Sequence, residues 1–126
     1  MAWESKFDAF TIQAKEDMET EQYQAVALDD GKVANDGSEA IGILQNKPLT
    51  NEFASIGYQG IMKFRAGGAV AAAARMTVTT SGYFVTAGSG YYIVGRALAA
   101  VTSGSIGTGL FNFFNPLYAN TSDFIG

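Results

Sequence analysis

The side chains best suited to chemistry in this sequence are carboxylates. Asp29 and Asp30 are adjacent in "LDDGKVA", and Asp36 and Glu39 follow in "NDGSEA". Paired carboxylates serve as general acid and base or as calcium ligands only when an activating group or further oxygen ligands accompany them at fixed spacing. The chain contains no His and no Cys, so it lacks the usual base near neutral pH and the usual zinc ligands. We therefore expect no enzyme activity, no metal site and no cofactor.

The residues around the aspartate pair favour a turn. "QYQAVALDDGKVA" predicts two short strands that flank Asp29, Asp30 and Gly31. Gly31 can supply the positive φ that a tight hairpin needs, and Asp side chains cap their own backbone in turns. A turn therefore accounts for Asp29 and Asp30, and they need not belong to a catalytic or calcium site.

Short apolar runs separated by glycines and prolines continue along the chain. "EAIGILQNKP" predicts a strand that ends near Pro48, and "EFASIGYQGIMKFRAGG" predicts two strands or one bulged strand, with the irregularity at Gly57 and Gly60. "RMTVTTSGYFVTAGSGYYIVGRALAAV" predicts three strands with turns at residues 81–82 and 88–90, and "SIGTGLFNFFNP" predicts a last strand. This spacing predicts an all-β fold, either a compact antiparallel barrel or a sandwich.

An alanine-rich run interrupts the β pattern. "AVAAAARM" follows Gly67 and Gly68 and is too short for an independent helix, so we expect a short helical turn near residues 69–75 packed on the sheet. Small side chains also let backbones approach closely where copies of a chain meet. Ala71, Ala72 and Ala73 are therefore candidate subunit-interface residues.

Charge is concentrated in the first segment. Residues 1–22 contain six acids and two lysines, whereas the other 104 residues balance six acids with six bases. Nucleic-acid binding relies on Lys and Arg, so we expect no nucleic-acid partner. The longest apolar runs are far shorter than a membrane span, and the acidic start does not resemble a signal peptide. We expect no membrane association and no export.

Both termini carry bulky apolar side chains. The stretch "FDAFTIQAK" alternates well enough to lie extended as a strand. We expect an N-terminal arm that adds to the sheet edge of another chain and is anchored by Trp3, Phe7, Phe10 and Ile12, the alternative being a frayed, solvated terminus. The tail "NPLYANTSDFIG" holds the apolar residues Leu117, Tyr118 and Phe124 after a proline. We expect this tail to dock on a neighbouring subunit or a larger surface, with disorder as the alternative.

The order of these segments resembles a known group of proteins. "AVALDDGKVA", "AIGILQNKP", "GIMKFRAGGAVAAAARMTVTTSGYFVTAGSG", "YYIVGRALAA" and "GLFNF" are similar, over roughly residues 23–114, to the small capsid decoration or cement proteins of tailed bacteriophages. The resemblance implies a β-barrel or β-tulip domain on the outer surface of the expanded head, often as a homotrimer. It also implies an arm that reaches the major capsid protein. Arg75 stands where such proteins commonly have an acid.

These observations together predict an arm at residues 1–22, a β domain at 23–115 and a tail at 116–126. By the resemblance, the chain is a structural virion protein, made in the host cytoplasm, that bridges major capsid protein subunits and stabilises the shell. The alternative is a receptor- or glycan-binding module of a virion, in which Tyr58, Tyr83, Tyr91 and Tyr92 form a stacking surface.

Overall fold

The computed structural model describes residues 6–27, 34, 40–88, 92–113 and 117–118. Strands dominate this part of the chain, and its helical content is one 3-10 turn, η1 (Thr80–Gly82). The strands are β1 (Lys6–Gln13), β2 (Ala25–Ala27), β3 (Ala40–Leu44), β4 (Phe53–Arg65), β5 (Arg75–Val78), β6 (Phe84–Thr86), β7 (Tyr92–Ile93), β8 (Gly95–Ala97), β9 (Ile106–Asn112) and β10 (Leu117–Tyr118). None of the described residues forms a helix long and apolar enough to cross a membrane.

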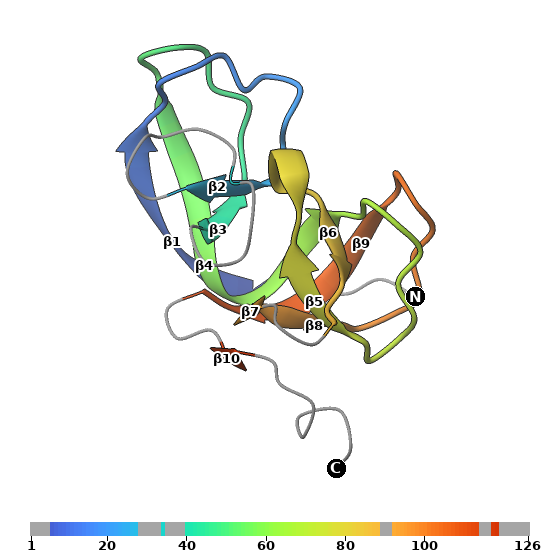
Figure 1. Ribbon diagram of the computed structural model, residues 1–126. Coiled ribbons are helices and arrows are strands. Elements are labelled where there is room, and N and C mark those ends of the chain that lie inside the picture. The colour runs from blue at the N-terminus through green and yellow to red at the C-terminus, as the bar shows by residue number, and fades with distance from the viewer. Residues whose placement is uncertain (1–5, 28–33, 35–39, 89–91, 114–116, 119–126) are drawn as a thin grey trace.

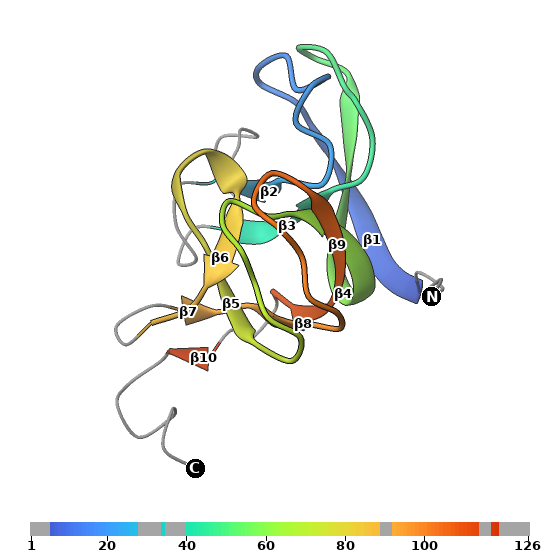
Figure 2. The ribbon, with the colours of Figure 1, turned by 90° about the vertical axis from the view of Figure 1, so that its right-hand side faces the viewer.

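One sheet contains most of the strands, in the order β2-β3-β4-β9-β8-β5-β6, with β1 added to β4. Every pairing between named strands is antiparallel. Figures 1 and 2 show that the sheet curls until its ends approach each other. The small sheet of β7 and β10 lies below it in Figure 1.

Two contacts link the β6 end of the curled sheet back to segments that flank β4 and β2. Ala66, just after β4, forms a parallel bridge with Phe84 of β6. The Gln24 side chain, just before β2, donates a hydrogen bond of 2.8 Å from Nε2 to the backbone oxygen of Ser81. The antiparallel, nearly closed barrel confirms the all-β fold class predicted from the strand spacing.

The long strand β4 pairs with three other strands, β1, β3 and β9. Ile56 pairs with Phe10 of β1 and with Leu44 of β3, while Gly60 pairs with β1 and β9. β1 therefore occupies one edge of β4, and β3 and β9 share the other. A bulge interrupts the β1–β4 register between Asp8 and Ala9, and Gly60 has a φ of 118°. The irregularity predicted from the glycines is confirmed, and β4 is one bulged strand.

Two large groups of side chains form most of the core. The larger group fills the barrel around four aromatic rings, those of Phe64, Phe84, Phe111 and Phe113. A second group lies beside it and contains Ala14, Met18, Val26, Leu44, Ala54 and Ile56. A small third cluster consists of Ala87 and Ile93. The sheet is thus packed mainly on two separate apolar clusters, and β4 contributes to both.

The alanine run forms a β-turn, and the helical turn predicted at residues 69–75 is wrong. Val70 bridges Val101, Arg75 begins β5, and the amide of Ala74 donates to the oxygen of Ala71 at 3.1 Å. Because strand pairing commits both ends of the run, the four residues between them cannot nucleate a helix, whatever the propensity of alanine. Ala73 adopts a φ of 67° to close the turn.

Candidate functional site

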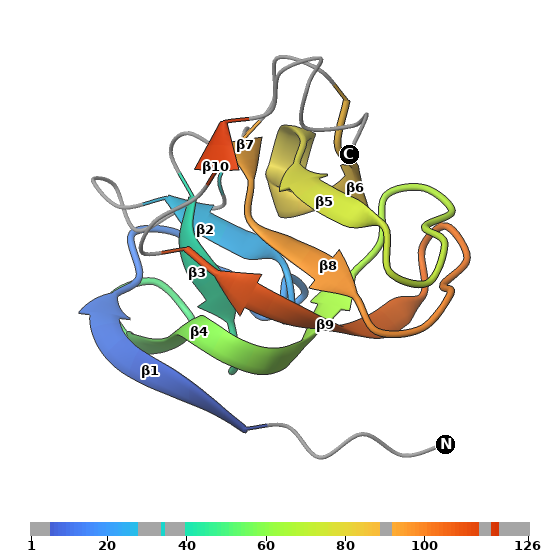
Figure 3. The same ribbon diagram turned by 90° about the horizontal axis from the view of Figure 1, so that it is seen from below.

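Strand β1 presents an open edge. It pairs with β4 over eight residues, and within the described part of the chain no strand pairs with its other side. In Figure 3, which views the molecule from below, β1 forms the outer border of the sheet beside β4. A long strand with an unpaired edge carries a row of free N–H and C=O groups, and such a row is a template for a strand of another chain.

Two phenyl rings at the ends of β1 are exposed. Phe7 near its start retains 36 % of its surface in solvent, and Phe53, which pairs with Gln13 at its end, retains 72 %. Exposed large apolar side chains beside an unpaired edge are typical of a protein-binding surface. We define the open edge of β1 with Phe7 and Phe53 as the edge surface. The sequence reasoning missed Phe53, whose exposure depends on its position at the start of β4.

The residues predicted to anchor the N-terminal arm do not all lie in the same environment. Trp3 lies outside the described residues, and Phe7 belongs to the edge surface. Phe10 packs on Tyr58, with ring centroids 5.5 Å apart, and Ile12 packs against the second core cluster. These two side chains stabilise their own chain.

The segment after β1 is anchored as well. Ala14 and Met18 are fully buried, and the Met18 amide donates to the oxygen of Pro48 at 2.9 Å. The sequence predicted an arm separate from the domain up to residue 22, whereas the structure packs Ala14 and Met18 into the second cluster. The pattern of apolar residues identified an extended segment but not its pairing partner within the chain.

The predicted subunit-interface residues lie at two places. Ala71, Ala72 and Ala73 are exposed on the turn before β5. Leu117 and Tyr118 form β10 and pair with Ile93 and Tyr92 of β7, and Phe124 lies outside the described residues. The structure does not bring the alanine turn and β10 into one strand pair, and their role as interface residues stays a prediction.

The tyrosines come from different elements. Tyr58 lies on β4 against Phe10, Tyr83 follows η1, and Tyr92 lies on β7. Tyr91 is outside the described residues, as are the carboxylates Asp29, Asp30, Asp36 and Glu39. The stacking surface predicted for a glycan-binding module stays untested.

Two loops carry a group of acidic side chains. Residues 14–24 and 45–52 lie together at the top of Figure 1 and hold five acids, Glu16, Asp17, Glu19, Glu21 and Glu52, against two lysines. The Asp17 carboxylate joins the loops, because its Oδ1 accepts hydrogen bonds from the Thr50 hydroxyl at 2.7 Å and amide at 2.8 Å. These bonds lower the pKa of Asp17. We call this pair of segments the acidic loops.

Glu21 in the same loops has the opposite shift. Burial raises its pKa, and the nearby Glu16 charge adds to the effect; Oε2 is buried and has no hydrogen-bond partner among the described residues. Because the pKa in the folded protein exceeds its ordinary value of 4.5, the native state binds protons more readily, and ionisation of Glu21 costs stability as pH rises above about 4.5.

Glu21→Gln is therefore expected to raise the free energy of unfolding at pH 7 by at most about 1 kcal/mol, since solvent screens a partly exposed carboxylate. The gain should disappear near pH 4, where the wild-type carboxyl is protonated. Thermal melts of both proteins from pH 4 to pH 7 check this. An equal gain at all pH values would contradict the assignment to ionisation.

Comparison with known proteins identifies a similar fold. No known protein-family profile matches the chain, and no curated protein matches it in sequence. Among solved structures, the crystal structure of the head fiber gp8.5 N base of bacteriophage phi29 aligns with a TM-score of 0.69 and 15 % identity, over 86 % of this chain and 96 % of that one. The chain therefore shares the fold of a base domain found in a phage head fiber.

Proposed function

We propose that this chain is a structural protein of a bacteriophage head, without enzymatic activity, that decorates the outer surface of the expanded shell. In this role it binds the major capsid protein and bridges neighbouring capsid subunits as a homotrimer, so that the shell resists the pressure of packaged DNA. The shared fold with a phage head fiber base supports the location on a virion.

The observation that carries the proposal is the edge surface. A decoration protein needs contacts that form after the shell has assembled, and a strand edge can accept an extended capsid segment without rearranging either core. Phe7 and Phe53 add apolar contacts at the two ends of the strand, and large aromatic side chains are frequent centres of binding energy.

The low fraction of charged residues is consistent with a protein that covers part of its surface by binding to a capsid. Charged residues make up 16 % of the sequence, against about a quarter in average soluble domains. Many copies on one lattice also strengthen weak contacts, because a trimer that holds one capsid subunit presents its other edges at high effective concentration. Modest contacts at each edge are then sufficient.

The double variant Phe7→Ser/Phe53→Ser tests the edge surface. Both side chains are exposed, so the variant should fold, and we expect its affinity for expanded empty phage shells to fall at least about tenfold. Copies bound per shell, counted after sedimentation over a range of protein concentrations, give the affinity. Removing residues 1–5, which include Trp3 but leave β1 whole, tests the arm separately.

Ile106→Ser is the matched control. Ile106 is 43 % exposed on β9, where it pairs with Arg65 at the far end of β4, so its loss should leave shell binding unchanged. If wild-type protein binds none of the shells, or if the double variant binds as tightly as the wild type, the proposal is wrong.

A further inference from the structure

Hydrogen bonds on the far side of β4 identify which backbone groups of β1 face its open edge. Thr11 pairs with Ser55 of β4, and Gln13 pairs with Phe53. The Ser55 amide donates to Oδ1 of Asn46 at 3.0 Å, and the Phe53 carbonyl oxygen accepts from Nδ2 of the same side chain at 3.0 Å. Both β4 residues therefore direct backbone groups away from β1.

Thr11 and Gln13 consequently direct their own N–H and C=O groups to the open edge. In an antiparallel ladder, pairs that exchange both hydrogen bonds alternate with pairs whose backbone groups point away from each other. The next residue fits this alternation, because the Ala14 amide donates to the oxygen of Glu52 at 2.9 Å. Two residues before Ala14, Ile12 accordingly has its amide toward β4. A strand added to β1 would thus bond to Thr11 and Gln13.

The side chains of β1 indicate which residues such a strand needs. Phe10 and Ile12 pack against the second core cluster and are only half-buried. Successive side chains of a strand point to opposite faces, so apolar side chains at every second position would extend this cluster over Phe10 and Ile12. Thr11 and Gln13 are exposed on the other face, where polar side chains fit. The matching partner alternates apolar and polar residues.

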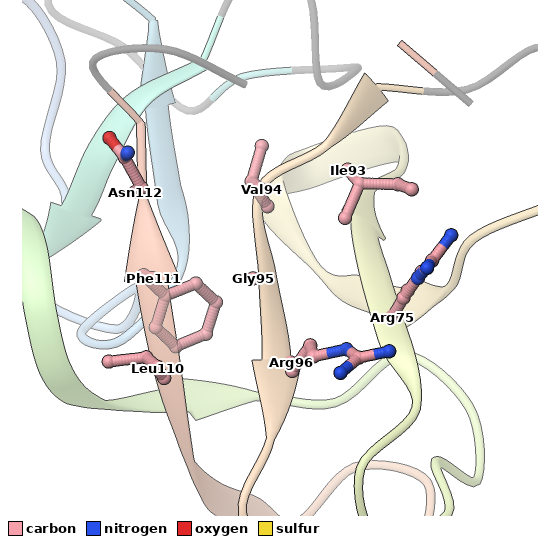
Figure 4. Close-up of a pocket in the computed structure, with 8 residues that line it drawn as sticks. All are labelled: Arg75, Ile93, Val94, Gly95, Arg96, Leu110, Phe111 and Asn112. Carbon is pink, nitrogen blue, oxygen red and sulfur yellow. The ribbon is translucent and has the colours of Figure 1, made fainter. Parts of the chain in front are cut away.

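The charge at the end of β1 favours a basic partner. The strand ends at Gln13 and leads directly into the acidic loops, which hold five acids against two lysines. The pocket of about 390 Å³ on β5, β7, β8 and β9 differs in charge, since Arg75 and Arg96 line it and none of its described lining residues is acidic (Figure 4). Complementary charge therefore directs a basic segment to the end of β1, whereas this pocket offers it no carboxylate.

We propose that the open edge of β1 binds an extended segment of the partner protein in which apolar and polar residues alternate and Lys or Arg residues lie beside the acidic loops. The segment pairs antiparallel, the commoner arrangement of strands, through the N–H and C=O groups of Thr11 and Gln13. Its basic end is then its N-terminal end, because an antiparallel strand starts where β1 ends. The inference rests on the proposed function, in which the partner is the major capsid protein.

A labelled synthetic peptide, Lys-Lys-Val-Ser-Val-Ser-Val-Ser, tests this chemistry on the full chain without shells. Fluorescence anisotropy should show binding at least about tenfold tighter than that of the same peptide with Glu-Glu in place of Lys-Lys, since like charges at an interface disfavour association. Hydrogen exchange followed by NMR reports the pairing itself. The peptide should slow exchange of the Thr11 and Gln13 amides at least about tenfold, whereas the Ile12 amide should be protected with and without peptide.

Thr11→Pro removes one edge N–H and leaves the hydrogen bonds to β4 in place, because proline is tolerated in an edge strand where its position faces solvent. We expect this variant to bind the lysine peptide at least about tenfold more weakly. Thr11→Val keeps the N–H and is the matched control. Leu110→Ser is a second control, since Leu110 is 53 % exposed in the pocket of Figure 4 and belongs to β9, on the opposite side of β4 from β1. Both controls should bind as the wild type does.

Thermal melts verify folding of the variants, and hydrogen exchange on wild-type protein decides the question if Thr11→Pro does not fold. Equal binding of the two peptides, unchanged exchange at Thr11 and Gln13, or undiminished binding by folded Thr11→Pro would overturn the inference. Shell binding is measured separately. A chain that binds the lysine peptide but no shell would support this edge chemistry and refute the capsid role alone.

Discussion

Phe84→Ala is expected to lower the free energy of unfolding by about 3–5 kcal/mol, the usual cost of removing a buried phenyl ring. Phe84 is fully buried and contacts three other rings, those of Phe64, Phe111 and Phe113, at centroid distances of 5.6, 5.3 and 6.2 Å. It also lies on β6 at the bridge to Ala66, so its loss both opens a cavity and weakens the closure of the barrel.

This loss is a large part of the total stability of a domain, which is about 5–15 kcal/mol. Urea denaturation followed by circular dichroism measures it. Phe53→Ala serves as the control, because Phe53 is largely exposed and its replacement should change stability by no more than about 0.5 kcal/mol. Equal effects of the two substitutions would mean that Phe84 is not central to the core.

Gly82→Ala is expected to have a comparably large effect for a different reason. Gly82 in η1 has a φ of 79°, and a Cβ there would lie 2.6 Å from the backbone oxygen and 2.9 Å from the backbone nitrogen of Ala25. Backbone atoms of β2 cannot move aside cheaply, so the barrel must open between η1 and β2. We expect a loss of about 3 kcal/mol or more, the sum of backbone strain and overpacking.

Gly104→Ala separates these two causes. Gly104 has nearly the same φ, 80°, but a Cβ there has nothing within 4 Å. Its substitution should cost only the strain of a positive φ, about 1–2 kcal/mol. Unfolding by urea under identical conditions compares the two variants, and equal losses would exclude a steric role for the contact with Ala25.

Local patterns predicted much of the sheet. Pro48 marks the end of the strand at residues 40–44 correctly, and Gly57 and Gly60 mark the bulged strand β4. The predicted turn at residues 81–82 is present, where Ser81 and Gly82 both adopt positive φ values. These features succeed because proline and glycine act on the backbone of their own neighbourhood, whatever surrounds them.

Features set by distant partners were not predictable in the same way. The propensity of alanine favoured a helical turn at residues 69–75, but pairing of Val70 with Val101 and of Arg75 with Arg96 commits the ends of that run to strands. Alternation in residues 6–13 indicated an extended segment, yet alternation does not specify which edge it joins. Long-range pairing depends on contacts that no window of sequence contains.

The same limit applies to the candidate surfaces. Phe7 was identified because bulky apolar residues are unusual in an acidic segment, and it is exposed on the edge surface. Phe53 was missed, since a phenylalanine that begins a strand is normally buried. The pairing of Arg75 with Arg96 depends on the register of β5 and β8, which are separated by a turn, β6 and β7 in the chain.

The division of most of the core between two clusters implies that local stability differs between the two parts of the molecule. Strand β1, the loop at residues 14–18 and the first half of β4 enclose the smaller cluster, whereas the aromatic rings belong to the larger one. Regions with fewer buried apolar contacts open at lower free energy than the whole domain. The end of the molecule that carries the edge strand can therefore loosen and adapt to an uneven surface while the barrel stays folded.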